Sequence, residues 1–400
     1  MLWQPSLPER YLQATEDELC VAIAGRRREL GSKLLVLGHH YQQDDVIRHA
    51  DLVGDSLKLS QMAAIEAPKR GAKHIMFCGV HFMAETADIL TDDDVGVILP
   101  DLSAGCSMAD MASYEDTVDA WELIHAAIRA ANTNQRVVPL TYVNSTAAIK
   151  AFVGQHGGAC CTSSNAARVF EWALAGGDSP KTRGEEIKIL FLPDQHLGRN
   201  TAKTHDFVTE VDAAARGGIA ETALWNPKLD HGGLAHDRIV DAKVLLWAGH
   251  CSVHKLFRPE HVADARAAGR TVLVHPECAQ EVVDLADLAG STEFIIDTID
   301  RAAPGSQWSV GTEIHLVNRI ARRAVERSVD VRILSDCQCL CTTMYRIDQA
   351  HMAWCLDQLA AGKVVNRISV HPEAKRLARL ALERMLRLTP TRYGALSSAD

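Results

Sequence analysis

Three features are absent from the sequence, and each absence excludes a class of protein. No apolar run approaches the roughly 18 residues that a membrane-spanning helix needs. Residues 1–5 contain no basic segment leading into an apolar core, so we expect no signal peptide and a cytoplasmic location. Basic residues are outnumbered, with 42 Lys and Arg against 51 Asp and Glu and a formal net charge of −9. A net negative charge disfavours binding to the phosphate backbone of a nucleic acid. We therefore expect neither a nucleic acid nor a membrane as a partner.

The composition is that of an ordinary folded chain. Hydrophobic residues make up 47% and charged residues 23%, which excludes a disordered, collagen-like or coiled-coil protein. At roughly 150 residues per domain, 400 residues correspond to two or three domains.

The chain has eleven cysteines, an odd number that argues against a disulfide framework in a reducing compartment. Four lie inside apolar runs, where a free thiol packs as a small hydrophobe: Cys20, Cys78, Cys160 and Cys355. The other seven are open to chemical roles: Cys106, Cys161, Cys251, Cys278, Cys337, Cys339 and Cys341.

An internal repeat organises the chain. Residues 36–56 and 272–292 both begin with a strand-like apolar run that ends in a histidine, His39 and His275. In both segments Ala-Asp follows eleven positions after the histidine, and a hydroxyl residue follows at position seventeen. Five aligned matches at this distance indicate two copies of one unit.

A weaker third copy lies between these two, over residues 137–165. Its apolar strand ends at Tyr142, and Ser163 is the corresponding hydroxyl, so the match needs a short insertion. In all three copies, short apolar runs alternate with amphipathic stretches, which predicts parallel sheets covered by helices on both faces.

We therefore expect an α/β protein of three homologous three-layer αβα domains around a pseudo-threefold axis. The expected domains are 22–133, 134–266 with an inserted excursion over 201–238, and 267–400 including C-terminal helices. One of these helices is predicted near 373–388, with a solvated basic face.

One cysteine recurs in each copy. Cys106, Cys251 and Cys341 each follow the fourth predicted strand of their unit. Open α/β sheets hold ligands at the carboxyl ends of their strands. If the three units pack with these ends inward, the three thiols converge on one point.

Thiolates select zinc or iron–sulfur clusters. A structural zinc site needs four ligands, usually from local pairs. Three cysteine ligands on a [4Fe–4S] cluster instead leave one iron open as a Lewis acid, which favours catalysis.

Polar side chains accompany the thiols at the predicted strand ends: His39, Tyr41, Tyr142, Asn144, His275 and Glu277. The hydroxyl residues Ser56, Ser163 and Thr292 are each predicted to open a helix after a second strand. Helix N-termini bind anions, so the three positions suit a substrate with carboxylates or a phosphate.

Ten segments in order resemble the quinolinate synthase family, between about residues 33 and 350: Gly38–Gln42, Gly54–Leu57, Phe77–Thr86, Ala104–Asp110, Tyr142–Ser145, Cys161–Asn165, Phe191–Asp194, Trp247–His254, His275–Glu277 and Cys341–Met344. The resemblance implies a [4Fe–4S] enzyme of de novo NAD synthesis. It would condense iminoaspartate with dihydroxyacetone phosphate to quinolinate, with loss of phosphate and water.

The resemblance also implies roles for individual residues. Cys106, Cys251 and Cys341 match the cluster ligands. The residues that match substrate-binding positions are His39, Ser56, Tyr142, Val143, Asn144, Ser163, His275, Pro276, Glu277 and Thr292. Glu277, assisted by His275, Tyr41 and Tyr142, would move protons, and Tyr41 matches a mobile active-site tyrosine. The enzyme that supplies iminoaspartate is a further expected partner.

Several positions keep two interpretations. His40 departs from the family's frequent Asn. Cys337 and Cys339 are spare thiols, a redox pair or packing residues. His254 is either a donor near the cluster sulfurs or a structural histidine. His81 and Glu85, one helical turn apart, are better explained by a helix-face hydrogen bond than by a metal.

Three other functions fit parts of the pattern. Another iron–sulfur hydro-lyase would form an alkene diacid instead of a pyridine. A cluster-based sensor would need a recognition surface such as a basic patch, which the sequence does not show. A zinc protein would contain one zinc and no sulfide.

Overall fold

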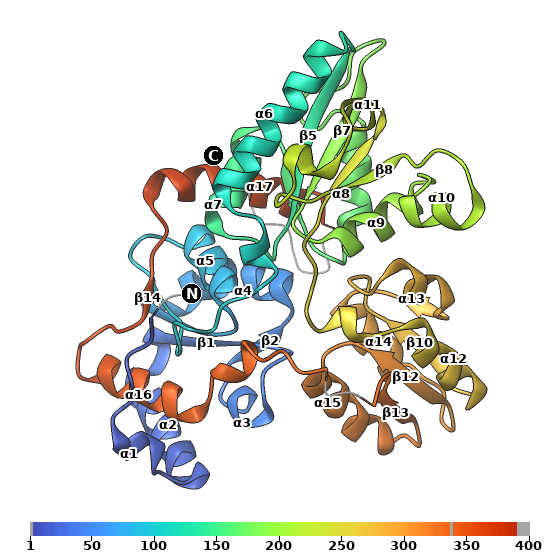
Figure 1. The fold of residues 1–400 in the computed structure, drawn as a ribbon. Helices are drawn as coiled ribbons and strands as arrows, with labels where there is room; N and C mark the ends of the chain where they lie inside the picture. Colours follow the sequence, from blue (N-terminus) through green and yellow to red (C-terminus); the bar gives the residue numbers. More distant parts are fainter. Residues whose placement is uncertain (1–2, 337–338, 390–400) are drawn as a thin grey trace.

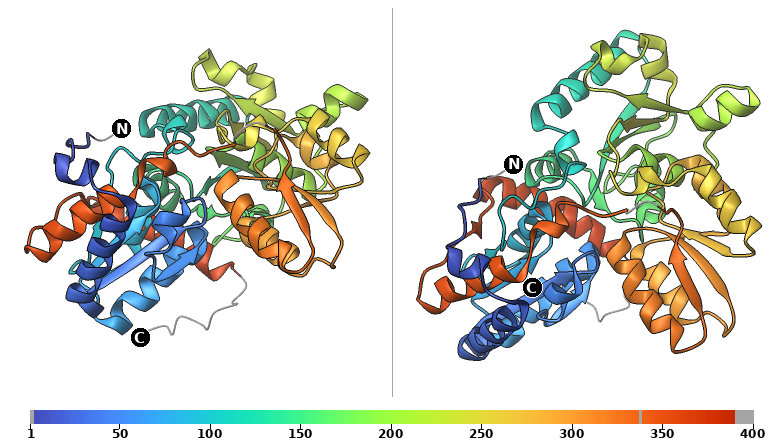
Figure 2. Two further views of the ribbon diagram at one scale, coloured as in Figure 1. Left: turned by 90° about the horizontal axis from the view of Figure 1, so that it is seen from below. Right: turned by 60° about the horizontal axis from the view of Figure 1, so that its bottom comes forward.

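The computed structural model describes residues 3–336 and 339–389, and these fold into three separate β-sheets with helices packed around them (Figure 1). The blue, green and orange parts of the chain form three lobes (Figure 2). The predicted α/β architecture of three αβα units is confirmed.

The three sheets share one strand order, which follows from the repeat. In each, the first strand lies between the second and the third, and the fourth pairs with the third, all in parallel. These twelve strands are β1 (Leu34–His39), β2 (Leu52–Gly54), β3 (His74–Cys78), β4 (Gly96–Ile98), β5 (Gln135–Tyr142), β6 (Ala159–Cys161), β7 (Glu186–Leu192), β9 (Val244–Trp247), β10 (Thr271–Val274), β11 (Leu288–Ala289), β12 (Gln307–Gly311) and β13 (Asp330–Ile333).

The central strands are largely buried, since helices cover both faces of each sheet. All six residues of β1 are buried, as a parallel strand between two helical layers requires. The helices of the first two units are α1 (Glu9–Leu12), α2 (Glu16–Leu30), α3 (Asp44–Ile47), α4 (Ser56–Arg70), α5 (His81–Leu90), α6 (Tyr114–Ala130), α7 (Ala147–Gln155), α8 (Ala166–Leu174), α9 (Gln195–Thr204), α10 (Glu210–Arg216) and α11 (His236–Asp241). In Figure 1, α4 and α5 lie on one side of the first sheet and α2 on the other.

The helices of the third unit and of the C-terminal segment are α12 (Pro259–Ala267), α13 (Gln280–Leu285), α14 (Thr292–Asp300), α15 (Ile314–Val325), α16 (Gln349–Ala360) and α17 (Pro372–Arg387). None of the helices within the described residues is long and apolar enough to cross a membrane.

The expected excursion over 201–238 contributes structure to the second sheet. It contains α10 and β8 (Thr222–Trp225), which pairs with β9 as an added edge strand. Trp225 of β8 is buried. This part of the insertion is therefore a covered sheet edge, while α10 projects from the lobe (Figure 1).

The C-terminal segment returns to the first two units. Strand β14 (Arg367–Ile368) pairs antiparallel with β4, and α17 packs against α7 and β6. The close approach of α17 and α7 depends on Gly154, because a Cβ there would lie 2.0 Å from the carbonyl oxygen of Leu377. The segment thus fastens the first two units together.

Packing also bears on where the units begin. Helix α6 contacts α7 and α11 of the second unit, and α12 contacts β10 and α13 of the third. We keep the three-domain division (22–133, 134–266 and 267–400) as a proposal, although these contacts group α6 with the second unit and α12 with the third.

Candidate active site

A single pocket is lined by residues from all three units. In each unit, lining residues come from the carboxyl ends of the first, second and fourth strands or from the segments that follow these strands. The cavity has a volume of about 70 Å³. Since one water needs roughly 10–15 Å³, it has room for a small organic molecule. The predicted residues that line it are His39, Tyr41, Ser56, Cys106, Tyr142, Val143, Asn144, Ser163, Cys251, His275, Glu277, Thr292 and Cys341.

The three predicted cysteines lie at equivalent positions in this pocket. Each is followed, three residues later, by the first residue of a 3₁₀ turn: η2 (Ala109–Met111), η4 (His254–Leu256) and η5 (Met344–Arg346). The turns direct two backbone N–H groups toward each thiol, from the second and third residues after it. Such N–H groups stabilise a thiolate, so the repeat gives the three thiols matching surroundings.

Burial opposes ionisation of these thiols when no metal is bound. It raises the pKa of Cys106 to about 12 and also raises the pKa values of Cys251 and Cys341. A coordinating metal reverses this balance, because it deprotonates the thiol outright.

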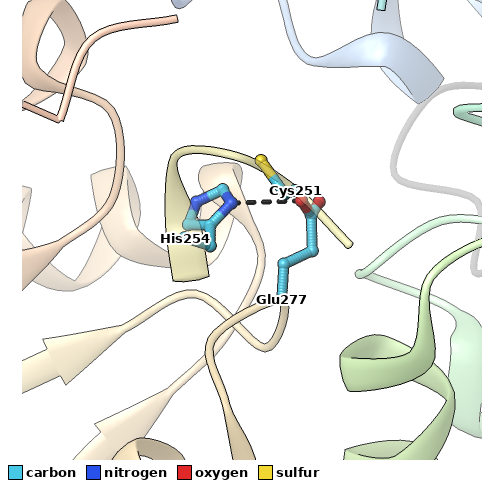
Figure 3. Close-up of side chains that lie close together, drawn as sticks. All are labelled: Cys251, His254 and Glu277. Atoms are coloured by element: carbon cyan, nitrogen blue, oxygen red, sulfur yellow. Dashed lines mark hydrogen bonds and ion pairs between the residues drawn. The ribbon is translucent and has the colours of Figure 1, made fainter. Parts of the chain in front are cut away.

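The donor set fits a multi-iron cluster. Cys251, His254 and Glu277 form a compact group, in which one ligand atom of each residue lies within 4.8 Å of the other two (Figure 3). Neither Cys106 nor Cys341 belongs to this group. The three thiols line one pocket, but only Cys251 belongs to the compact group. This spread suits a metal cluster better than a single ion.

Two buried histidines have the same orientation in the first and third units. The backbone N–H of Tyr41 donates to Nδ1 of His39 at 3.1 Å, and that of Glu277 donates to Nδ1 of His275 at 3.3 Å. Nδ1 is therefore the acceptor, and Nε2 carries the proton in the neutral ring. Burial lowers the pKa of both histidines to about 3. At neutral pH both are uncharged donors.

A hydrogen-bond network joins two tyrosines across the pocket. Tyr142 Oη donates to Glu277 Oε1 at 2.5 Å, and Glu277 Oε2 lies 3.1 Å from His254 Nδ1. His254 Nε2 lies 3.1 Å from Thr312 Oγ1, which lies 3.0 Å from Tyr41 Oη. Tyr142 is the last residue of β5, and the segments that follow β1, β9, β10 and β12 each contribute one other member.

Glu277 is ionised in this network. Burial acts to raise its pKa, but His254 and His275 and the hydrogen bonds from His254 and Tyr142 hold the pKa below the usual range. Burial also raises the pKa of Tyr41 and Tyr142, so both phenols stay protonated. The network therefore presents the Glu277 carboxylate to the neutral phenol of Tyr142, and Asp55 is a second acidic residue in the pocket lining.

The predicted hydroxyl residues do not serve as N-caps. Asp55 and Ser291 cap α4 and α14, and Ser56 and Thr292 are the first residues within those helices. Ser163 does not open a helix as expected, because α8 begins three residues later, at Ala166. Its Oγ lies 3.2 Å from His275 Nε2.

Other predicted residues lie outside the pocket lining or outside the description. Pro276 is not among the lining residues, and its carbonyl accepts a hydrogen bond from Asn200. Cys339 is buried in the core of the third unit, and Cys337 lies outside the described residues. His40 bonds Glu293, at 3.2 Å.

The expected helix-face hydrogen bond between His81 and Glu85 is a longer contact in the structure, beyond hydrogen-bond distance. The two side chains lie 3.8 Å apart, and Glu85 also accepts the backbone N–H of Ala147 at 2.9 Å.

Sequence reasoning missed Thr312. The corresponding positions after β3 and β7 are Gly79 and Pro193, so the repeat carries no signal there. Its only sequence cue is its place directly after a buried strand of a βα unit.

Comparison with known proteins agrees with this geometry. A family model described as quinolinate synthetase A protein matches residues 22–387. The chain is 49% identical over 382 residues to a quinolinate synthase of Acidobacterium capsulatum, with 95% of both chains covered. It is 47% identical over 376 residues to one of Streptomyces coelicolor, covering 94% of this chain and 89% of the relative.

Proposed function

The chain belongs to the quinolinate synthase family of enzymes, and from this premise we propose that it condenses iminoaspartate with dihydroxyacetone phosphate, with loss of phosphate and water. The observation that carries the proposal is the pocket in which one cysteine from each unit meets the Glu277 network. A cytoplasmic location and a partnership with the enzyme that supplies iminoaspartate are part of this proposal.

Cys106, Cys251 and Cys341 would hold a [4Fe–4S] cluster, one per chain, with three cysteine ligands. Bound there, the cluster would supply Lewis acidity at the iron that has no protein ligand. The backbone N–H groups of the three turns would stabilise the thiolates, and the apolar wall formed by Phe82 and Met108 would limit access of water.

Proton transfer is the proposed role of Glu277. Its carboxylate is the base of the hydrogen-bond network, and Tyr142 and His254 occupy both its oxygens. A proton taken from the substrate would be held at this carboxylate. The hydroxyl of Thr312 continues the chain of exchangeable protons from His254 to Tyr41.

Substrate binding would use neutral dipoles. No Lys or Arg occurs among the described residues that line the pocket. The Nε2–H group of His39 and the hydroxyl of Ser56 remain as donors for carboxylate and phosphate oxygens, and a substrate oxygen would compete with Ser163 Oγ for the Nε2–H group of His275. The side-chain oxygen of Asn144 is buried without a partner in the described protein, so a bound substrate would satisfy that amide.

Anaerobic turnover with both substrates tests the proposal. We expect formation of the pyridine product, with its ultraviolet band, at a rate that Glu277→Gln lowers by about 100-fold or more. An alkene diacid without a pyridine would instead identify a hydro-lyase. An unchanged rate in Glu277→Gln would remove the carboxylate from the mechanism.

A further inference from the structure

A compact group of metal-ligand residue types overlaps the pocket. Cys251 Sγ, a ring nitrogen of His254 and a carboxylate oxygen of Glu277 all lie within 4.8 Å of one another (Figure 3). His254 Nδ1 and Glu277 Oε2 are 3.1 Å apart. This group shares only one residue with the three thiols assigned to the cluster.

The donor types are those of zinc. Thiolate, imidazole and carboxylate are its three usual protein ligands, at about 2.3 Å for sulfur and 2.0–2.2 Å for nitrogen and oxygen. Two ligands at about 2.1 Å in tetrahedral geometry are separated by about 3.4 Å. The nitrogen–oxygen distance in the structure is already close to that value, so little movement is needed.

The charges also balance. His254 and Glu277 have side chains that are 1% and 5% exposed, so a net charge at this position would be costly. A thiolate, a carboxylate and a neutral imidazole together offset the two positive charges of the ion. Binding would release one proton, from Cys251.

The His254 ring and the Glu277 carboxylate each make a second hydrogen bond, through the atom that would not bind the metal. The other ring nitrogen of His254 bonds Thr312 Oγ1, and the other oxygen of Glu277 accepts from Tyr142. Metal-binding histidines and carboxylates are typically oriented by such partners, which fix the tautomer and direct the lone pair.

We propose that the chain without a cluster binds one Zn²⁺ through Cys251, His254 and Glu277, with a fourth position open to water or an anion in the pocket. Cys251 is a ligand in both assemblies, so the ion and the cluster exclude each other. Zinc would therefore hold the enzyme in a state that cannot assemble its cluster. The zinc site goes beyond the proposed function and does not require it, because the ion binds through residues of the cluster-free chain alone, whereas the exclusion rests on the proposed cluster.

The test is titration of the full-length, cluster-free chain with Zn²⁺ against a chromophoric chelator, under anaerobic reducing conditions. We expect one tight equivalent and one released proton. Cys251→Ser, His254→Gln and Glu277→Gln should each weaken binding by about 100-fold or more, because each removes a ligand. Cys106→Ser and Cys341→Ser are the matched controls and should bind as the unmodified chain does.

Co²⁺ supplies a spectroscopic readout that does not depend on activity. The unmodified chain and the Cys106→Ser variant should show a thiolate-to-cobalt charge-transfer band that is absent from Cys251→Ser. Circular dichroism checks that each variant is folded. Equal loss of binding in Cys106→Ser and Cys251→Ser would overturn the proposal, as would the absence of a saturable equivalent. Retention of zinc after a full cluster has assembled would overturn the exclusion.

Discussion

Thr312 offers a sharp test of the hydrogen-bond network because one atom joins its two halves. The side chain is buried, and its Oγ1 lies 3.0 Å from Tyr41 Oη and 3.1 Å from His254 Nε2. Thr312→Val keeps the shape and removes both hydrogen bonds. Leaving buried partners unsatisfied costs about 1–3 kcal/mol. If that cost falls on the transition state, kcat drops by about 5- to 150-fold.

The assay is anaerobic quinolinate formation, with kcat and KM determined separately and iron measured on the same samples. Thr312 is a positioning residue, so we expect the loss in kcat with iron content unchanged. Thr312→Ser keeps the hydroxyl and should retain most of the activity. The reasoning is refuted if the kcat of Thr312→Val is within twofold of that of the unmodified enzyme, or if Thr312→Ser lowers kcat as much as Thr312→Val does.

Three further predictions concern packing, pH and loop position. Gly154→Ala should lower the free energy of unfolding by about 1–3 kcal/mol, measured by denaturant unfolding, because its Cβ would meet the backbone of Leu377. Glu293 is part-buried, which raises its pKa, but His40 and the nearby lysine hold the pKa at about 2 instead of the usual 4.5. Its contribution to stability is therefore full above about pH 4.5 and is lost as the pH falls toward 2, so Glu293→Gln should destabilise the chain more at pH 6 than at pH 3. The guanidinium of Arg319 donates to the carbonyls on both sides of Tyr41, at 2.8 and 2.6 Å, so Arg319→Met should speed hydrogen exchange over that loop and raise KM.

Each of these predictions has a control or an opposing result. Gly25 lies within α2 with open space where a methyl group would be added, so Gly25→Ala should leave stability unchanged or raise it. An equal effect of Glu293→Gln at both pH values would remove the ion pair from the stability argument. Arg322→Met, which loses only a bond to Asp44, should leave exchange near Tyr41 unchanged.

The repeat in the sequence predicted most of the fold, since His39 and Tyr142 end β1 and β5, His275 directly follows β10, and the three sheets have the same strand order. It also placed Cys106 and Cys341 in one pocket. Buried strands and helix starts are encoded by the local sequence pattern, so they could be predicted from a single chain.

Contacts between units could not be predicted in the same way. The Tyr41–Thr312 bond joins residues 271 positions apart, and no periodicity records it. The C-terminal helix was expected to have a solvated basic face, yet Arg384 donates to the carbonyls of Gly154 and Gly158, and Arg379 to that of Ile89. These arginines satisfy carbonyl groups in other elements, which depends on tertiary packing.

The central claim is that three cysteines from three repeats hold one cluster, and iron and sulfide analysis after anaerobic reconstitution tests it most directly. We predict about four iron and four sulfide per chain, with loss of both when Cys106, Cys251 or Cys341 is individually replaced by alanine. A chain that takes up no sulfide, or a full cluster that persists in any of the three variants, would contradict the account.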